Sequence, residues 1–229
     1  ARGCYIIVRM IENLDVRVVV FRLHDEQLQV LLRPEGESAT WALPGCQVAQ
    51  DLSLDEAAAG TVQRVAGLGD PYLEQLYTYG DAGRLDRGQR LISVAYIAIL
   101  PVNAGDGAQP AFSKDEQAPQ WFPVDRLPAL WGDHGEVIRY ALRRVRYKLE
   151  YTAIGFQLLP EAFSLSELQS VYEMILGERL DKRNFRRRIL RAGIIEETST
   201  LRAGEGRPAR LYRYRPDAVA EIKARRLFP

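Results

Sequence analysis

The segment that most restricts the fold is the run QRLISVAYIAIL, which spans Gln89–Leu100. It is apolar at nearly every position, and this pattern is typical of a strand that is buried on both faces. Upstream, Asp15–Leu32 contains two β-branched runs around a turn at His24–Gln27, which predicts a β-hairpin. Apolar residues at helical spacing predict a helix over Gly135–Lys148. The first part of the chain therefore predicts an α/β or α+β domain.

The stretch Leu43–Leu68 contains a loop followed by a helix with well-defined ends. Ser53 is a favourable N-cap, and Gly67 is expected to end the helix. Asp55 and Glu56 fall in the first turn, where the helix dipole favours negative charge. We therefore expect these two acids to be solvated residues that stabilise the helix start.

The character of the chain changes after Tyr151. Ser164 and Glu167 have the spacing of a capping box and predict a helix that ends at Gly177. A second helix is predicted over Asp181–Ala192, and two short strands with a Gly- and Arg-rich loop between them follow it. A helix, a turn, an arginine-rich helix and a hairpin follow one another in a winged helix-turn-helix.

The net charge of +1 conceals a difference between the two parts of the chain. From Ser164 to the end there are 15 Lys+Arg and 9 Asp+Glu, a net charge of +6, whereas the preceding residues hold 16 and 21, a net charge of −5. The C-terminal part is therefore a candidate for binding a polyanion.

An arginine-rich helix by itself is often only a solvated surface, but the neighbouring turn and Gly/Arg loop favour DNA binding. We expect Phe185, Ile189 and Leu190 to pack inward. The residues predicted to read DNA from the second helix are Lys182, Arg183, Asn184, Arg186 and Arg187. Those predicted to contact phosphates or the minor groove from the wing are Arg207 and Arg210.

Several features argue against other classes of protein. No apolar run approaches the roughly 18 residues that cross a membrane, and the N-terminus lacks a signal-peptide pattern. Cys4 and Cys46 are the only cysteines, which fits a reducing, cytoplasmic location. His24 and His134 are the only histidines and lie in no metal-binding motif, so we expect surface or packing roles for them, no metal site and no cofactor.

The stretch Leu43–Leu68 resembles the Nudix box. That family writes the box as Gly, five residues, Glu, seven residues, then Arg-Glu-aliphatic-any-Glu-Glu-any-Gly-aliphatic. The closing pair matches Gly67 and Leu68. The acidic and Arg-Glu positions of the box fall instead on Leu52, Gly60, Thr61, Arg64 and Val65.

These replacements remove the chemistry of the box. Nudix hydrolysis uses Mg²⁺, which needs oxygen ligands, usually carboxylates. Arg64 places a cation where a ligand is required, and Val65 has no donor atom. We therefore expect no catalytic residues and no hydrolysis, although a remaining pocket could bind a nucleoside diphosphate. The alternative is a divergent Nudix-type nucleoside diphosphate hydrolase with a basic accessory domain.

The order of motifs over nearly the whole chain resembles the NrtR-type regulators, the Nudix-related repressors of bacterial NAD metabolism. This resemblance implies an α+β protein: a Nudix α/β/α sandwich with a mixed sheet at 1–152, for effector sensing and dimerisation, and a winged helix-turn-helix at 153–229. It also implies a homodimer on an inverted-repeat DNA operator, responsive to ADP-ribose or a related metabolite, although some relatives sense sugars. The matching segments are Gln75–Asp81, Asp86–Gly88, Lys148–Thr152, Phe156–Pro160, Phe163–Gln169, Leu180–Arg187 and Gly206–Tyr212.

The effector would be bound by arginines and aromatic residues of the first domain. A guanidinium group binds diphosphate oxygens in a fork, and an aromatic ring can stack on adenine. Ordinary surface arginines and structural aromatics remain the alternative. The residues predicted to bind the effector are Arg33, Trp41, Tyr79, Arg84, Arg87 and Arg90.

Overall fold

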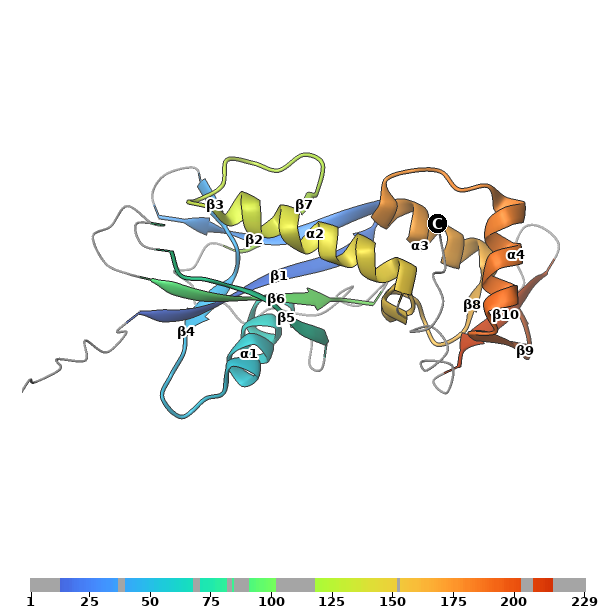
Figure 1. The fold of residues 1–229 in the computed structure, drawn as a ribbon, viewed down its shortest axis with the longest axis horizontal. Helices are drawn as coiled ribbons and strands as arrows, with labels where there is room; N and C mark the ends of the chain where they lie inside the picture. The colour runs from blue at the N-terminus through green and yellow to red at the C-terminus, as the bar shows by residue number, and fades with distance from the viewer. Residues whose placement is uncertain are drawn as a thin grey trace, which may run out of the picture.

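The computed structural model contains two connected parts, each built around a sheet (Figure 1). A seven-stranded sheet with one helix on each face is followed by a three-stranded sheet with two helices. This α+β arrangement agrees with the predicted fold class. The structure describes residues 13–36, 40–67, 71–81, 84, 91–101, 118–151, 153–202 and 208–215.

The predicted hairpin is formed by β1 (Leu14–His24) and β2 (Gln27–Glu35), which pair antiparallel. The turn residues Asp25 and Glu26 have φ angles of 47° and 56°. Two left-handed residues are what a two-residue hairpin turn requires, although Asn-Gly would adopt them with less strain. The hairpin and its turn therefore lie where the sequence predicts them.

The apolar run forms β6 (Ile92–Ile99), which lies parallel to β1 in the middle of the sheet. Its residues from Val94 onward are buried, which confirms a strand covered on both faces. The remaining strands pair antiparallel, so the sheet is mixed. They are β3 (Thr40–Ala42), β4 (Gly45–Gln47), β5 (Tyr72–Tyr79) and β7 (Gln120–Pro123).

Helices α1 (Leu54–Ala66) and α2 (His134–Tyr151) cover opposite faces of this sheet. Alternation along β1 divides its side chains between them: Val18 belongs to the apolar cluster under α1, and Val19 to the cluster under α2. Helix α1 begins at Ser53 and ends at Gly67, as predicted. None of the helices in the described part of the chain is long and apolar enough to cross a membrane.

The second part has the order of a winged helix-turn-helix. A short 3₁₀ helix, η1 (Ala153–Leu158), leads into β8 (Phe163–Ser164), and the small sheet has the order β8-β10-β9. The helices begin at caps on Ser164 and Asp181 and end at the left-handed Gly177 and Gly193. Both ends of the first helix lie where the sequence predicts them, whereas Asp181, predicted as the first residue of the second helix, is its N-cap. The remaining elements are α3 (Leu165–Leu176), α4 (Lys182–Ala192), β9 (Ile195–Arg202) and β10 (Ala209–Tyr214).

The apolar core under α2 continues into the winged helix. One cluster of buried residues joins β1, β2 and α2 to η1, α3 and α4, whereas the cluster under α1 stays within the large sheet. Phe156 of η1 stacks on Tyr214 of β10 with ring centroids 4.8 Å apart. The α2 face of the sheet is therefore the face through which the two parts are packed together.

Candidate effector pocket and DNA-binding surface

Helix α1 carries the segment that resembles the Nudix box, and its side chains make structural contacts. The Arg64 guanidinium donates a hydrogen bond to the Gly45 carbonyl at 3.2 Å, and Val65 is buried in the core. Thr61 Oγ1 donates to the Ala57 carbonyl at 2.9 Å. Across the ranges that the structure describes, no three His, Cys, Asp or Glu side chains are grouped so that they could hold a metal ion. These residues therefore pack α1 against its surroundings.

The acidic residues at the start of α1 have structural partners. Glu56 accepts a hydrogen bond from the Ser53 backbone N–H at 2.8 Å, which completes the capping box and lowers the pKa of Glu56. Asp55 accepts a hydrogen bond from the Tyr96 hydroxyl at 2.6 Å. Burial and this bond raise the pKa of Tyr96. Asp55 and Glu56 are both exposed first-turn acids, as the sequence predicts, and Asp55 also ties the helix to the sheet.

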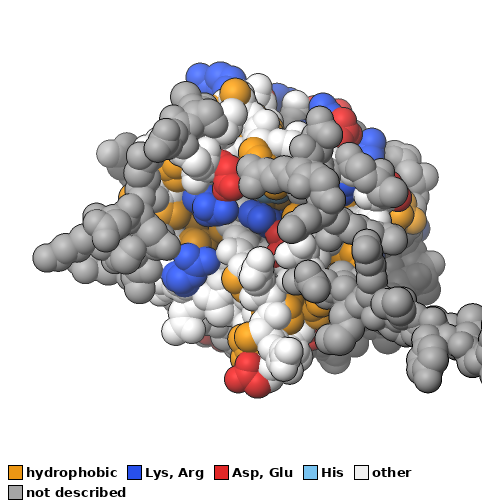
Figure 2. Space-filling model, turned by 90° about the vertical axis from the view of Figure 1, so that its left-hand side faces the viewer, with side chains coloured by type: hydrophobic (Ala, Val, Ile, Leu, Met, Phe, Trp, Pro, Cys, Tyr) orange, Lys and Arg blue, Asp and Glu red, His pale blue; other side chains and the backbone are white. Residues whose placement is uncertain are grey.

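A pocket of about 350 Å³, here called the β4 pocket, opens at the end of the large sheet that carries β4. Its walls include Asp15 and Arg17 of β1, Arg33 and Glu35 of β2, and Trp131 before α2. Figure 2 faces this end of the molecule and shows basic side chains gathered beside acidic and apolar ones. The pocket therefore offers both signs of charge and an aromatic ring.

Asp15 is the most deeply buried acid of this pocket. The residue is 3% exposed, and its Oδ2 accepts a hydrogen bond from Arg17 Nε at 2.7 Å. Its Oδ1 is buried without a hydrogen-bond partner in the described part of the chain. Arg17 also donates to the Leu43 carbonyl at 3.2 Å and lies over the Trp131 ring, 5.9 Å from its centroid. An unsatisfied buried carboxylate oxygen can accept a hydrogen bond from a bound ligand.

The predicted effector-binding residues lie in different surroundings. Arg33 lines the β4 pocket and pairs with Glu35, with 2.6 Å between Nη2 and Oε2. Trp41 is not in the wall of this pocket and packs edge-on against Phe122, with ring centroids 4.7 Å apart. Arg87 and Arg90 lie outside the described residues.

Arg84 and Tyr79 form a separate, partly buried group. The Arg84 side chain is 7% exposed and pairs through two nitrogens with the Asp133 carboxylate. Its remaining terminal nitrogen donates to the Tyr79 carbonyl at 3.2 Å and to Ser93 Oγ at 2.9 Å. Neither Arg84 nor Tyr79 lines the β4 pocket. The guanidinium thus has structural partners, and the role of both residues in effector binding stays a prediction.

His134 fastens the start of α2 to the loop between β3 and β4. The residue is fully buried, and its Nδ1 accepts a hydrogen bond from the Leu43 backbone N–H at 3.0 Å. Burial and the nearby Arg17 lower the pKa of His134 to about 3, so its imidazole is neutral at pH 7. Its ring meets that of Trp131 edge-on, with centroids 5.0 Å apart. This histidine is the packing residue that the sequence predicts.

Helix α4 presents a polar face to solvent and packs on two apolar residues. Phe185 and Ile189 lie on one side of the helix and are buried, so the opposite side faces solvent. Arg187 donates to the Asn184 side chain at 2.7 Å, so these two side chains lie together on the exposed face. The exposed residues that the sequence predicted for DNA reading are Lys182, Arg183, Asn184 and Arg187.

Two residues of α4 differ from the expected pattern. Arg186 is only half exposed and donates to Ser166 Oγ of α3 at 3.1 Å, so it links the two helices. Leu190 was expected to pack inward, but it is 50% exposed. That expectation was wrong because Phe185 and Ile189 already face the core, and Leu190 lies about 100° further around the helix than Ile189.

The wing is the β9–β10 hairpin. Arg210 is exposed and pairs with Glu197 at 2.7 Å, an exposed ion pair of a kind that contributes only about 0–1 kcal/mol. Its guanidinium therefore stays accessible to a phosphate. Arg207 lies outside the described residues. Arg202, which the sequence analysis did not single out, pairs with Glu167 of α3 and donates to the Ala162 carbonyl at 3.0 Å.

Known proteins are similar to this chain over both its large-sheet part and its winged helix. Residues 155–214 match the family model of the NrtR DNA-binding winged helix domain. The chain is 34% identical over 208 residues to the ADPR responsive transcriptional repressor NtrR of Acinetobacter baylyi, covering 88% of this chain and 81% of that protein. The match therefore extends well beyond the winged helix.

Two solved structures share the fold. Shewanella oneidensis NrtR complexed with a 27mer DNA is 32% identical, with a TM-score of 0.76, over 90% of this chain and 95% of that chain. A MutT/nudix family protein from Enterococcus faecalis, 23% identical, has a TM-score of 0.71 over 89% of this chain and 88% of that one. At that identity the second match shows the fold alone. Because its sequence matches a repressor relative over most of both chains and its winged helix matches the family model, the protein belongs to the NrtR family of transcriptional regulators.

Proposed function

We propose that this protein is a ligand-responsive DNA-binding repressor of NAD metabolism genes. The observation that carries the proposal is α4, whose exposed face is basic and polar within a winged helix that matches the NrtR family. Arginine can bridge the two acceptors of guanine, and asparagine can pair with adenine. The Acinetobacter baylyi relative is named as an ADPR responsive repressor, which supports ADP-ribose or a related metabolite as the effector.

We further propose that the two parts of the chain have different roles. Residues 1–152 would sense the effector and dimerise, and residues 153–229 would bind DNA in the cytoplasm. A single winged helix reads few base pairs, so a symmetric dimer on an inverted repeat supplies the second half-site. In each subunit, Arg183 and Arg187 would reach bases from α4, while Arg207 and Arg210 would contact the backbone from the wing.

The β4 pocket is our proposed effector site. Arg17 and Arg33 could bind diphosphate oxygens in a fork. Asp15 Oδ1, which has no hydrogen-bond partner among the described residues, could accept a hydrogen bond from a ribose hydroxyl. The Trp131 ring offers a face for adenine. A volume of about 350 Å³ is near the lower end for small-molecule pockets, so part of ADP-ribose would extend beyond it.

We also propose that binding is not followed by hydrolysis. Arg64 and Val65, at the metal-ligand positions of the Nudix box, are committed to a backbone hydrogen bond and to the core. Without carboxylates, those two positions cannot hold the Mg²⁺ that would activate a water molecule.

The repressor proposal is tested with DNA selected by the full-length protein from a random-sequence library. Fluorescence anisotropy would give the dissociation constant for the selected DNA and for a scrambled sequence, at two salt concentrations, with and without ADP-ribose. We expect preference for an inverted repeat, weaker binding at higher salt, and a change in affinity on adding ADP-ribose. Equal affinity for selected and scrambled DNA would rule out sequence-specific regulation.

The hydrolase alternative is tested with ADP-ribose and Mg²⁺. Chromatography of the mixture should show intact ADP-ribose after prolonged incubation. Turnover beyond one equivalent of protein, abolished by a chelator, would instead establish the hydrolase. An Arg33→Gln variant should bind ADP-ribose more weakly in calorimetry, whereas Arg139→Gln, on the exposed face of α2, should not.

A further inference from the structure

Helix α2 reaches from the β4 pocket to the winged helix. At its start, Trp131 lines the pocket, and its backbone N–H donates to the Trp41 carbonyl at 2.9 Å. Asp133 pairs with Arg84, and His134 accepts a hydrogen bond from the backbone N–H of Leu43. These contacts tie the first turn of α2 to the strands and loops around the β4 pocket.

The body of α2 is a continuous helix of 18 residues, about 27 Å long at 1.5 Å per residue. Its buried face includes Ile138 and Val145, which belong to the same apolar cluster as Val171 and Ile175 of α3. Close-packed interiors deform little, so a displacement at one end of such a helix is carried along its length.

At the far end, Arg146 of α2 holds the end of α3. Its Nε donates a hydrogen bond to the Ile175 carbonyl at 2.8 Å. Helices leave their last carbonyls without intrahelical partners, and a cation is favourable there. A Cβ placed on Gly177 would lie 3.4 Å from Arg146 Nη2, so the guanidinium also lies against the turn that leads to α4.

The turn that Arg146 holds is firmly connected to α3. Glu173 accepts a hydrogen bond from the Leu180 N–H at 2.8 Å, and Gln169 donates to the Leu180 carbonyl at 3.0 Å. The next residue, Asp181, is the N-cap of α4. Because these bonds join α3, the turn and the start of α4, a force on the end of α3 moves the DNA-reading helix with it.

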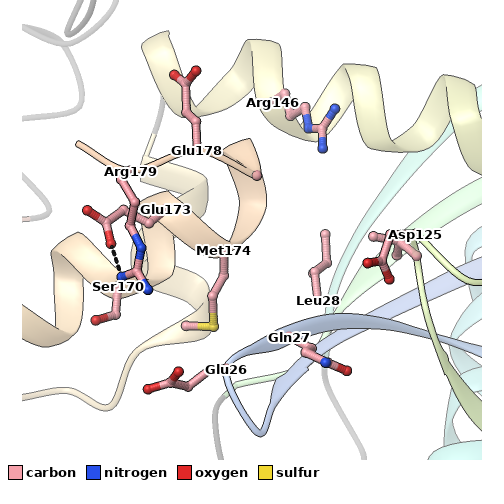
Figure 3. A pocket seen from close by; sticks show the side chains of 12 residues that line it. Glu26, Gln27, Leu28, Asp125, Arg146, Ser170, Glu173, Met174, Glu178 and Arg179 are labelled. Atoms are coloured by element: carbon pink, nitrogen blue, oxygen red, sulfur yellow. Dashed lines mark hydrogen bonds and ion pairs between the residues drawn. The ribbon is translucent and has the colours of Figure 1, made fainter.

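The turn also faces a second pocket of about 350 Å³, here called the hairpin pocket (Figure 3). It separates the β1–β2 turn, with Glu26 and Gln27, from Met174 and the α3–α4 turn. Arg146 and Leu28 also line it. The α3–α4 turn is therefore not closely packed against the hairpin, and it has space in which to move.

We propose that Arg146 is the positioning residue through which the β4 pocket controls the orientation of α4. A ligand that shifts the first turn of α2 displaces Arg146 relative to the sheet, and Arg146 carries α3, the turn and α4 with it. The hairpin pocket accommodates the movement. This inference rests on the proposed function, since it requires that ligand binding alters DNA affinity.

The test measures the ratio of DNA dissociation constants with and without ADP-ribose, the coupling factor between the two sites. Arg146→Met keeps the apolar stem and removes the donor, and Arg146→Lys restores a cationic donor. Arg143→Met is the matched control, an exposed arginine of α2 that lies over Tyr140. We expect Arg146→Met to reduce the coupling factor at least threefold, with Arg146→Lys nearer the parent and Arg143→Met unchanged. ADP-ribose affinity without DNA should stay within twofold.

A purely structural role predicts a different result. It would weaken DNA binding equally with and without ADP-ribose and leave the coupling factor unchanged, which would overturn the inference. If the parent protein binds DNA equally with and without ADP-ribose, the proposed effector response fails instead. Hydrogen exchange in ligand-free protein then tests Arg146 separately: amides of residues 175–180 should exchange faster in Arg146→Met than in Arg143→Met, and equal exchange would overturn the contact on which the inference depends.

Discussion

Helices α1 and α4 begin and end in the same way but present different surfaces. Each starts at a side-chain cap, Ser53 or Asp181, and ends at a left-handed glycine, Gly67 or Gly193, with a φ angle of 68°. Helix α1 buries six of its 13 residues, whereas α4 buries two of 11. The six include Thr61, at the glutamate of the Arg-Glu pair in the Nudix box, and Val65, at one of its metal ligands. Cap residues therefore fix where a helix lies, and the exposed residues between the caps decide what it can bind.

Among the substitutions that compare α1 with α4, one in the buried face of α4 should change the free energy of unfolding most. Phe185 is 2% exposed and meets Tyr172 edge-on at 5.4 Å, so Phe185→Ala leaves a cavity between α4 and α3. We expect the free energy of unfolding to fall by about 3–5 kcal/mol in urea denaturation. Val62→Ala in α1 should cost less, because it removes fewer buried atoms. A loss below about 1 kcal/mol for Phe185→Ala would contradict the packing of α4.

A substitution on the exposed face of α4 should weaken DNA binding and leave the free energy of unfolding nearly unchanged. Arg187→Ala is expected to weaken binding of the selected DNA by about 1–3 kcal/mol if its guanidinium reads a base. The free energy of unfolding should change by no more than about 0.5 kcal/mol, because the side chain is exposed. Anisotropy with matched and scrambled DNA measures the first quantity, and Arg139→Ala serves as the control. Equal weakening on both sequences, with a shallower salt dependence, would assign Arg187 to a phosphate instead.

Substitutions at the N-caps test whether the starts of α1 and α4 have different roles. Ser53 accepts a hydrogen bond from the Glu56 N–H, and Asp181 accepts one from the Asn184 N–H at 2.8 Å. Ser53→Ala and Asp181→Ala should each lower the free energy of unfolding by about 1 kcal/mol. Only Asp181→Ala should also weaken DNA binding, because it loosens the first turn of α4. If Ser53→Ala weakened DNA binding as much, the two helix ends would not be functionally distinct.

Gly60 gives the smallest expected effect. It stands in the middle of α1, where the Nudix box has arginine, and a Cβ built there meets nothing within 4 Å. Gly60→Ala should therefore raise the free energy of unfolding by about 0.4–1 kcal/mol, with ADP-ribose and DNA affinities unchanged. Thermal denaturation would show the gain. A loss of stability would mean that this position is covered in solution.

Local signals in the sequence predicted the ends of helices and the hairpin turn, because caps and turns depend on neighbouring residues. Strand β5 was not predicted from pattern, since Tyr72–Tyr79 is partly exposed along its length without a regular alternation of buried and exposed positions. The pocket around Asp15 was also missed, because its other walls come from β2, β4 and the segment before α2, far away in sequence. A usable signal was present: Asp15 and Arg17 are the polar positions at the start of an otherwise valine-rich strand.

The predicted site residues also differ in how far local sequence could place them. For α4, apart from Arg186, the exposed positions could be predicted because a helical period and one buried face determine which side chains are exposed, whereas their role in DNA binding stays a prediction. Leu190 failed because an apolar residue was assumed to face the core. The six effector residues were chosen by chemical type, and only a tertiary structure can say which of them share a pocket. Among them, Arg33 lines the β4 pocket.

His134 makes the stability of the protein depend on proton uptake. Its pKa is about 3 in the folded chain, against about 6.5 in an unfolded one, so below pH 6.5 the unfolded chain binds a proton that the folded chain excludes. The contribution is fully present above pH 6.5 and is lost as the pH falls towards 3, at up to about 1.4 kcal/mol per pH unit. Urea denaturation at pH 7 and pH 5 should show this loss, and His134→Gln should reduce it. Above pH 6.5 the imidazole holds Leu43 without titrating, which keeps the start of α2 insensitive to small changes in acidity.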